Sequence, residues 1–122
     1  MAGLTTTESQ ATLDARFPTT GATDYIAYSS NGTSESSALA RTSIGATGWA
    51  AATAADPSVK ANANALTTAA ATAAATITHF AVFSASTGGT QRTDWTLLTS
   101  ARTAAIGDQI TWAAGACQVT LT

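Results

Sequence analysis

The stretch that decides the fold is Thr76-Ile77-Thr78-His79-Phe80-Ala81-Val82-Phe83-Ser84. It is rich in aromatic and β-branched residues, which favour strands over helices. Apolar side chains fall on both faces of the extended chain, a pattern typical of a strand covered on both sides. The segment therefore predicts a buried strand in the middle of a sheet.

Downstream of it, short strand patterns alternate with turns. A glycine-rich turn at Thr87–Thr90 precedes a predicted strand at Thr93–Thr99, which has Trp95 and Leu97 on one face. Apolar and polar residues alternate again around 110–112 and through 117–122. Strict alternation indicates half-buried strands, so this half of the chain is predicted to be antiparallel β-structure.

Upstream, three segments continue the pattern: strands are predicted at 24–30 and 39–44, and one strand or two short ones at 58–68. A short helix is predicted at about 5–17, because Thr5 and Glu8 have the spacing of a capping box. Strands at intervals of eight to twelve residues are typical of a β-sandwich. We therefore expect a single domain over residues 1–122: a short helix followed by an antiparallel sandwich of six to eight strands, of jelly-roll or immunoglobulin-like type.

The run Ala69–Ala75 is the ambiguous part of this assignment. Alanine has the highest helix propensity of all residues, which favours a helix. However, no large side chain in the run could be buried against the rest of the protein, and an isolated helix of this length is marginal in water. We interpret the run as a loop, with a helix as the alternative.

The composition is unusual but does not indicate disorder. Of the 122 residues, 30 are Ala and 25 are Thr, whereas Leu, Ile, Val and Phe together number 18. Aliphatic-poor chains stay unfolded when their net charge is high. Here only 10% of residues are charged and the net charge is −2, so self-repulsion is weak. A thin hydrophobic core, completed by assembly with other chains, is the expectation.

Several functional classes are disfavoured. Five scattered cations do not form a nucleic-acid-binding patch, and no apolar run is long enough to predict a membrane span. The single cysteine, Cys117, cannot form an internal disulfide and is predicted to be a small buried apolar residue. The single histidine, His79, is predicted to be packed and hydrogen-bonded, with a pH sensor or metal ligand as the alternative. No catalytic residues, metal site or cofactor are predicted.

Candidate interface residues come from the charged and aromatic side chains. Arg41 and Arg102 are predicted either to pair with carboxylates of a neighbouring chain or to lie on plain surface. Trp49, surrounded by Gly and Ala, is expected to be exposed or at an interface, whereas Trp95 and Trp112 are expected in the core. Arg92 and Asp94 flank one turn and are predicted to form a solvated ion pair on the surface.

The chain resembles small bacteriophage virion proteins, described as tail-fibre-like, head-fibre, minor capsid or decoration proteins, many of them from phages of actinobacteria. It differs in two loops, at Ser29–Gly32 and at Ala69–Ala75. The segments that carry the resemblance are Thr78–Phe83, Thr87–Gly89, Leu98–Arg102, Gly107–Gly115 and Val119–Thr122, preceded in order by Tyr25–Ala27, Ala40–Arg41 and Trp49.

The resemblance implies a non-enzymatic, all-β structural protein of the virion, assembled in the host bacterial cytoplasm. We expect a capsid decoration or head-fibre-like protein that binds the major capsid protein, or another virion protein, as a homo-oligomer, with a trimer favoured. The alternative is a minor tail or tail-fibre-tip protein with weak binding of host-surface glycans. A secreted adhesion or carbohydrate-binding module is disfavoured because Met1–Glu8 does not have the pattern of a signal peptide. No nucleic acid or membrane partner is expected.

Overall fold

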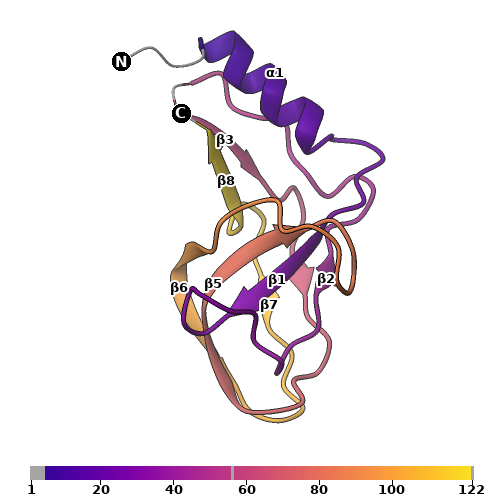
Figure 1. The fold of residues 1–122 in the computed structure, drawn as a ribbon, viewed down its shortest axis with the longest axis vertical. Helices are drawn as coiled ribbons and strands as arrows, with labels where there is room; N and C mark the ends of the chain where they lie inside the picture. Colours follow the sequence, from indigo (N-terminus) through magenta and orange to yellow (C-terminus); the bar gives the residue numbers. More distant parts are fainter. Residues whose placement is uncertain (1–4, 56, 122) are drawn as a thin grey trace.

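The computed structural model describes residues 5–55 and 57–121 and contains one helix and eight strands in these ranges (Figure 1). In chain order they are α1 (Thr6–Arg16), β1 (Tyr25–Ser29), β2 (Thr42–Ser43), β3 (Ser58–Ala61), β4 (Leu66–Thr67), β5 (Ala75–Phe83), β6 (Thr96–Ala104), β7 (Thr111–Trp112) and β8 (Gln118–Leu121).

The helix α1 begins and ends where its sequence predicts. The hydroxyl of Thr5 accepts a hydrogen bond from the backbone N–H of Glu8 at 3.2 Å, which caps the N-terminus. At the other end the N–H of Phe17 donates to the Leu13 carbonyl at 2.8 Å, just before Pro18. The prediction of a helix at about 5–17 is confirmed.

The largest sheet has the strand order β2-β1-β5-β6, and all of its pairs are antiparallel. The decisive strand β5 therefore lies between β1 and β6, and Ile77, Phe80 and Val82 are buried. Its interior position is what its two-sided apolar pattern predicts.

Two smaller antiparallel sheets complete the fold, β3 with β8 and β4 with β7. In Figure 1 the pair β3–β8 lies beneath α1, above the large sheet. The rings of Tyr28 in β1 and Trp112 in β7 stack at 6.1 Å and join two sheets through the core. The predicted all-β, sandwich-like class with a short helix is confirmed.

Two predicted strands have different bounds in the structure. The strand predicted at 39–44 is reduced to β2, and the one predicted at Thr93–Thr99 is displaced to β6. The pairing of β5 with β6 shifts between Ile77↔Arg102 and His79↔Leu97: two residues along β5 correspond to five residues along β6. This bulge lengthens β6 toward Ala104, and no local alternation in the sequence signals it.

The alanine run is a loop, as interpreted, up to Ala75, which begins β5. Backbone hydrogen bonds to a distant loop replace helical ones: the N–H of Ala71 donates to the Asp108 carbonyl, and the N–H of Gly107 donates to the Ala71 carbonyl, both at 2.8 Å. Ala71 is buried, so the small side chain is what lets these two loops meet.

Helices long and apolar enough to cross a bilayer are absent from the described ranges, where α1 has only 11 residues.

Candidate functional site

A groove of about 480 Å³ runs between α1, the connection that leads into β6, and the C-terminal strand β8. The four residues of β8, Gln118–Leu121, all line it. Because consecutive residues of a strand point to opposite faces, contact with all four means that the groove follows the edge of β8.

The edge of β8 that faces this groove has free backbone groups. The carbonyls of Val59 and Ala61 in β3 accept from the N–H groups of Thr53 and Ala50, both at 2.9 Å, so they point away from β8. Hydrogen-bonding direction alternates along an antiparallel strand. It follows that β3 bonds to β8 through Ser58 and Lys60.

The partners of Ser58 and Lys60 in the ladder are Leu121 and Val119, respectively. These two residues therefore use their backbone groups toward β3. Gln118 and Thr120 point theirs the other way, and among the described residues those groups have no hydrogen-bond partner. The groove thus contains an unpaired strand edge.

The helix wall of the groove is fixed by an ion pair between the buried Lys60 and the partly exposed Asp14. The ammonium of Lys60, whose side chain is 0% exposed, donates to Asp14 Oδ1 at 2.6 Å. The same carboxylate accepts from the N–H of Ala52 at 2.9 Å, and the Gln10 amide donates to the Ala52 carbonyl at 3.0 Å. The hydrogen bond from Lys60 holds the pKa of Asp14 below its ordinary value.

The opposite wall is fixed by Arg92. Its guanidinium pairs with the buried carboxylate of Asp24, donates to the Arg16 carbonyl, and lies over the Phe17 ring at 4.7 Å. Arg92 therefore ties the segment before β6 to the end of α1. The predicted surface pair of Arg92 with Asp94 is wrong, because Asp24, 68 residues away in sequence, is the partner.

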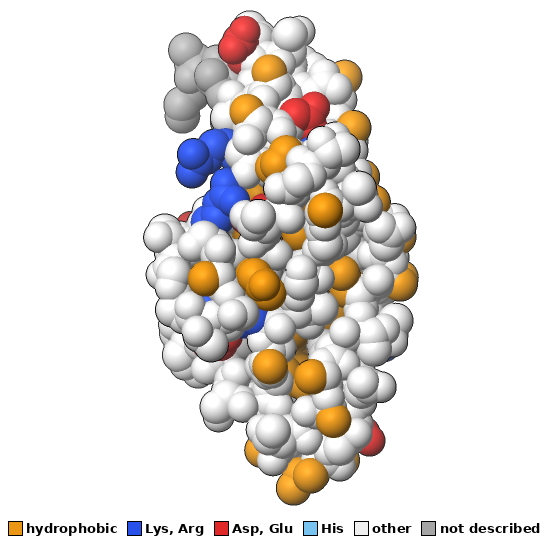
Figure 2. Space-filling model, turned by 90° about the vertical axis from the view of Figure 1, so that its right-hand side faces the viewer, with side chains coloured by type: hydrophobic (Ala, Val, Ile, Leu, Met, Phe, Trp, Pro, Cys, Tyr) orange, Lys and Arg blue, Asp and Glu red, His pale blue; other side chains and the backbone are white. Residues whose placement is uncertain are grey.

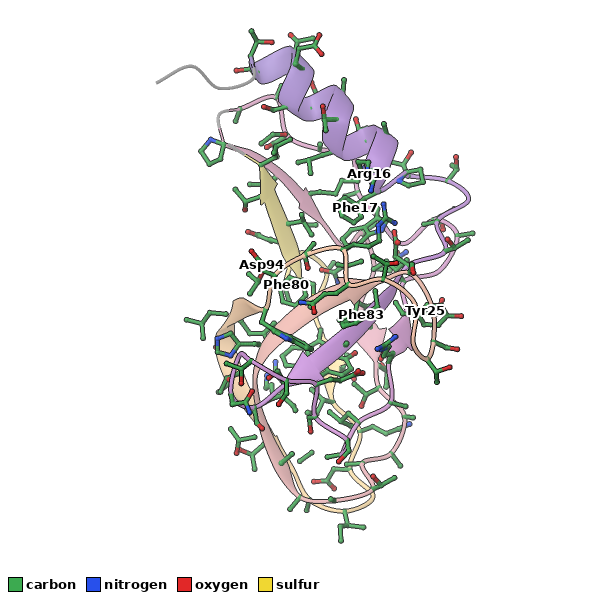
Figure 3. All side chains as sticks on the ribbon, viewed as in Figure 1. Arg16, Phe17, Tyr25, Phe80, Phe83 and Asp94 are labelled. Atoms are coloured by element: carbon green, nitrogen blue, oxygen red, sulfur yellow. The ribbon has the colours of Figure 1, made fainter. Side chains whose placement is uncertain are left out.

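Two charged side chains on the groove walls have no ion-pair partner within the part of the chain that the structure describes. Arg16 lies at the C-terminal end of α1, and Asp94 lies on the segment entering β6 (Figure 3). Figure 2 shows one larger group of basic side chains at the upper left of the view and smaller basic areas below it, with apolar side chains spread over the same face. The groove therefore has opposite charges on its two walls, beside the apolar side chains of Leu13, Phe17, Val119 and Leu121.

The prediction that Trp49 is exposed or at an interface is wrong, because the residue lies in the core of its own chain. Its side chain is 1% exposed and contacts Phe17, with ring centroids 5.3 Å apart. The indole N–H donates to Asp24 Oδ2 at 3.0 Å. The small neighbours in the sequence that suggested exposure instead allow α1 and the sheet to close around the ring.

Arg41 is engaged within its own chain. Its Nε and Nη2 donate to the two carboxylate oxygens of Glu35, both at 2.9 Å, and its Nη1 donates to the Ala85 and Gly88 carbonyls at 2.9 and 2.8 Å. The guanidinium lies 3.8 Å from the centre of the Phe83 ring, and the side chain is 7% exposed. This contradicts both alternatives predicted for Arg41, a pair with a carboxylate of a neighbouring chain and a place on plain surface.

Arg102 is the predicted interface residue that remains exposed. It lies on the edge strand β6 with its guanidinium 5.5 Å from the centre of the Trp112 ring. Trp112 is buried as predicted, whereas Trp95, also predicted in the core, is only half-buried and lies outside it. The groove is lined by none of the three predicted interface residues, Arg41, Trp49 and Arg102.

The remaining singled-out residues are structural. His79 is half-buried and its Nδ1 shares a hydrogen bond of 2.7 Å with the Thr78 hydroxyl, as predicted. Cys117 is fully buried, and burial raises the pKa of its thiol to about 12. Over residues 5–55 and 57–121, no three His, Cys, Asp or Glu side chains gather in a way that could hold a metal ion.

The groove itself was not predicted from the sequence. Its residues come from three segments that lie up to about a hundred positions apart, and nothing local distinguishes them. The one available signal was the alternation of residues 117–122, which predicted the strand but not which of its edges is free.

Comparison with known proteins identifies one family. A family model described as "Podophage GP4 fiber I protein gp80" matches residues 9–120. A search of curated proteins gives no significant match.

Proposed function

Because the chain belongs to the family of the podophage GP4 fiber I protein gp80, we propose that it is a fibre-like structural protein on the surface of a phage virion, held there as a homo-oligomer. The family match, which spans residues 9–120, is the observation that carries the proposal. Membership indicates a non-enzymatic virion component. We propose below where it sits on the particle, which symmetry it has and which proteins it binds.

The outer edge of the large sheet supports self-association. β6 is the last strand of the order β2-β1-β5-β6 and has one partner strand. Leu97 in β6 and Ile106 just beyond it are 70% and 73% exposed, and they are the large exposed apolar residues of the described ranges. Together with Arg102 they offer a neighbouring copy apolar and charged contacts at one edge.

We propose a trimer on the capsid lattice, of head-fibre or decoration type, that binds the major capsid protein. Capsid surface proteins commonly sit at local threefold positions, and a symmetric cluster lets weak contacts add up. A minor tail or tail-fibre-tip protein is the second candidate, and the word "fiber" in the family description favours it. Weak binding of host glycans belongs to that second candidate.

The number of copies per purified particle separates these locations. Quantitative mass spectrometry that finds hundreds of copies supports the capsid, whereas three to six copies support a tail site. If purified particles contain no copies, the virion function is wrong. A glycan array with no hits removes the glycan-binding version of the second candidate.

Self-association is tested with Leu97→Asp. Sedimentation equilibrium is expected to show a trimer for the wild type and a folded monomer for the variant, because a charge at an apolar contact disfavours burial. Thr20→Asp, in the exposed loop after α1, adds the same charge and is expected to leave the trimer intact. A wild-type monomer at all concentrations would contradict self-association.

A further inference from the structure

We propose that the free edge of β8 takes up an extended segment of a different virion protein as an added strand. The inference rests on the proposed virion function and names the way the chain is attached. Three observations carry it: the unpaired backbone groups of Gln118 and Thr120, the groove of about 480 Å³ along them, and the fixed walls on both sides.

The edge suits an added strand because its hydrogen-bonding groups are exposed and already in place. An extended peptide gains main-chain hydrogen bonds from such an edge, and its side chains enter the flanking pockets. The walls are positioned by Asp14 with Lys60 on one side and by Arg92 with Asp24 on the other. Because the groove is already formed, binding requires little further ordering of this chain.

A second copy of this chain does not suit the groove. The edge of β8 is flanked by α1 and by the segment before β6, so the β8 edge of another folded copy, flanked in the same way, could not reach it. A single extended segment needs only the space beside one strand. The other free edge of a second copy, at β6, is assigned above to contact between copies. We therefore infer that the occupant is an extended stretch of another polypeptide.

The charges on the walls define the chemistry of that stretch. Arg16 on the helix wall would attract a carboxylate of the bound segment, and Asp94 on the opposite wall would attract one of its cationic side chains. Neighbouring residues of a strand point in opposite directions. The segment that fits therefore carries an acidic and a basic residue next to each other.

Amide hydrogen exchange gives a direct test. In the isolated protein the amides of Gln118 and Thr120 are expected to exchange rapidly, and that of Val119 slowly, because Val119 is the one of these three residues that bonds to β3. On purified particles the amides of Gln118 and Thr120 are expected to be protected at least tenfold. Particles that contain the chain with these two amides unprotected would overturn the added strand while the virion function stands.

Substitution at Thr120 gives an independent test in complemented phage. Thr120→Pro removes an N–H that has no partner among residues 5–55 and 57–121, so the variant is expected to fold and to lose at least tenfold in copies per particle. Thr120→Ala keeps the N–H and is the matched control, expected to be incorporated like the wild type. Wild-type incorporation of a folded Thr120→Pro variant would contradict the proposal.

The charge requirement is tested with Arg16→Glu and Asp94→Lys. Each reversal is expected to lower the copies per particle severalfold, since it places a like charge opposite the segment. If Thr120→Pro does not fold, the amide exchange of the wild type still decides the matter. A glycan that protects neither amide but binds in a way that Arg16→Glu abolishes would identify a sugar site instead and overturn the added strand.

Discussion

At the scale of single residues, the charged side chains of Arg41 and Arg92 connect segments that are distant in sequence, and they are not simply solvated on the surface. Arg41 serves four acceptors, and Arg92 joins a carboxylate, a carbonyl and an aromatic ring. In a chain with so few large aliphatic residues, these planar guanidiniums cover aromatic rings and satisfy loop carbonyls at the same time. The five cations are therefore mostly structural.

A glycine shows how tightly one loop is packed. Gly32 has φ +76°, and a Cβ placed there would lie 2.9 Å from Nε2 of His79. Gly21 has φ +71° with open space around it, which makes it a matched control. We expect Gly21→Ala to cost about 1–2 kcal/mol through the backbone alone.

For Gly32→Ala we expect about 1 kcal/mol more, because the imidazole ring must shift. Urea unfolding of both variants measures the difference. In a His79→Ala background the excess is expected to disappear, and an excess that persists there would rule out the ring as its cause.

The buried thiol gives a second prediction at this scale. Burial raises the pKa of Cys117 to about 12, so the native protein holds almost no thiolate near pH 8. A thiol reagent such as DTNB is expected to leave the native protein unmodified and to react with one thiol per chain in denaturant. Rapid reaction under native conditions would show that β8 and its neighbours open readily.

At the scale of elements, the docking of α1 depends on polar contacts as much as on Leu13 and Phe17. Asp14 lies between the buried ammonium of Lys60 and the N–H of Ala52. The helix is thereby fixed to β3, and one wall of the groove with it. Sequence patterns predicted the helix well because its cap and its apolar spacing are local, whereas its docking partners are 38 to 46 residues away.

Removing either partner of this ion pair is expected to have unequal effects. Asp14→Asn leaves a fully buried ammonium without its counter-ion and is expected to destabilise by about 1–2 kcal/mol. Lys60→Met replaces the buried charge with an apolar chain of similar size and is expected to cost less, since Asp14 is partly solvated. Urea midpoints give the order, and equal costs would contradict this account.

At the scale of the whole molecule, two sheet edges have different roles in the proposed assembly. The edge at β6 carries exposed apolar residues for contact with a second copy, and the edge at β8 lies in a groove for an extended segment. The division keeps self-association apart from attachment. A single domain over residues 1–122 stays a prediction, and it agrees with a helix and three sheets that share core residues.

Acid is expected to weaken the whole molecule partly through Asp14. Its pKa is lowered in the folded state, so its contribution to stability is complete above the ordinary carboxyl pKa of about 4. That contribution is lost as the pH falls through the lower, folded-state value. Urea unfolding between about pH 6 and pH 3 should show a steeper loss for the wild type than for Asp14→Asn, and parallel curves would contradict the role of Asp14.

The sequence by itself determined the class of the fold, because strands, turns and the helix cap depend on patterns of residues that are close together along the chain. The alternation through 117–122 and the two-sided pattern of 76–84 correspond to β8 and β5 in the structure. The family resemblance, carried by short motifs, is confirmed by the match over residues 9–120.

Only the tertiary structure decided the partners of the polar and aromatic side chains and the position of the free edge. Trp49 is buried because Phe17 and Asp24 reach it from distant segments, and Arg92 finds Asp24 rather than its neighbour Asp94. The physical reason is that hydrogen bonds and ring contacts depend on distance in space. Strand alternation depends on spacing along the chain, which is the part that a sequence records.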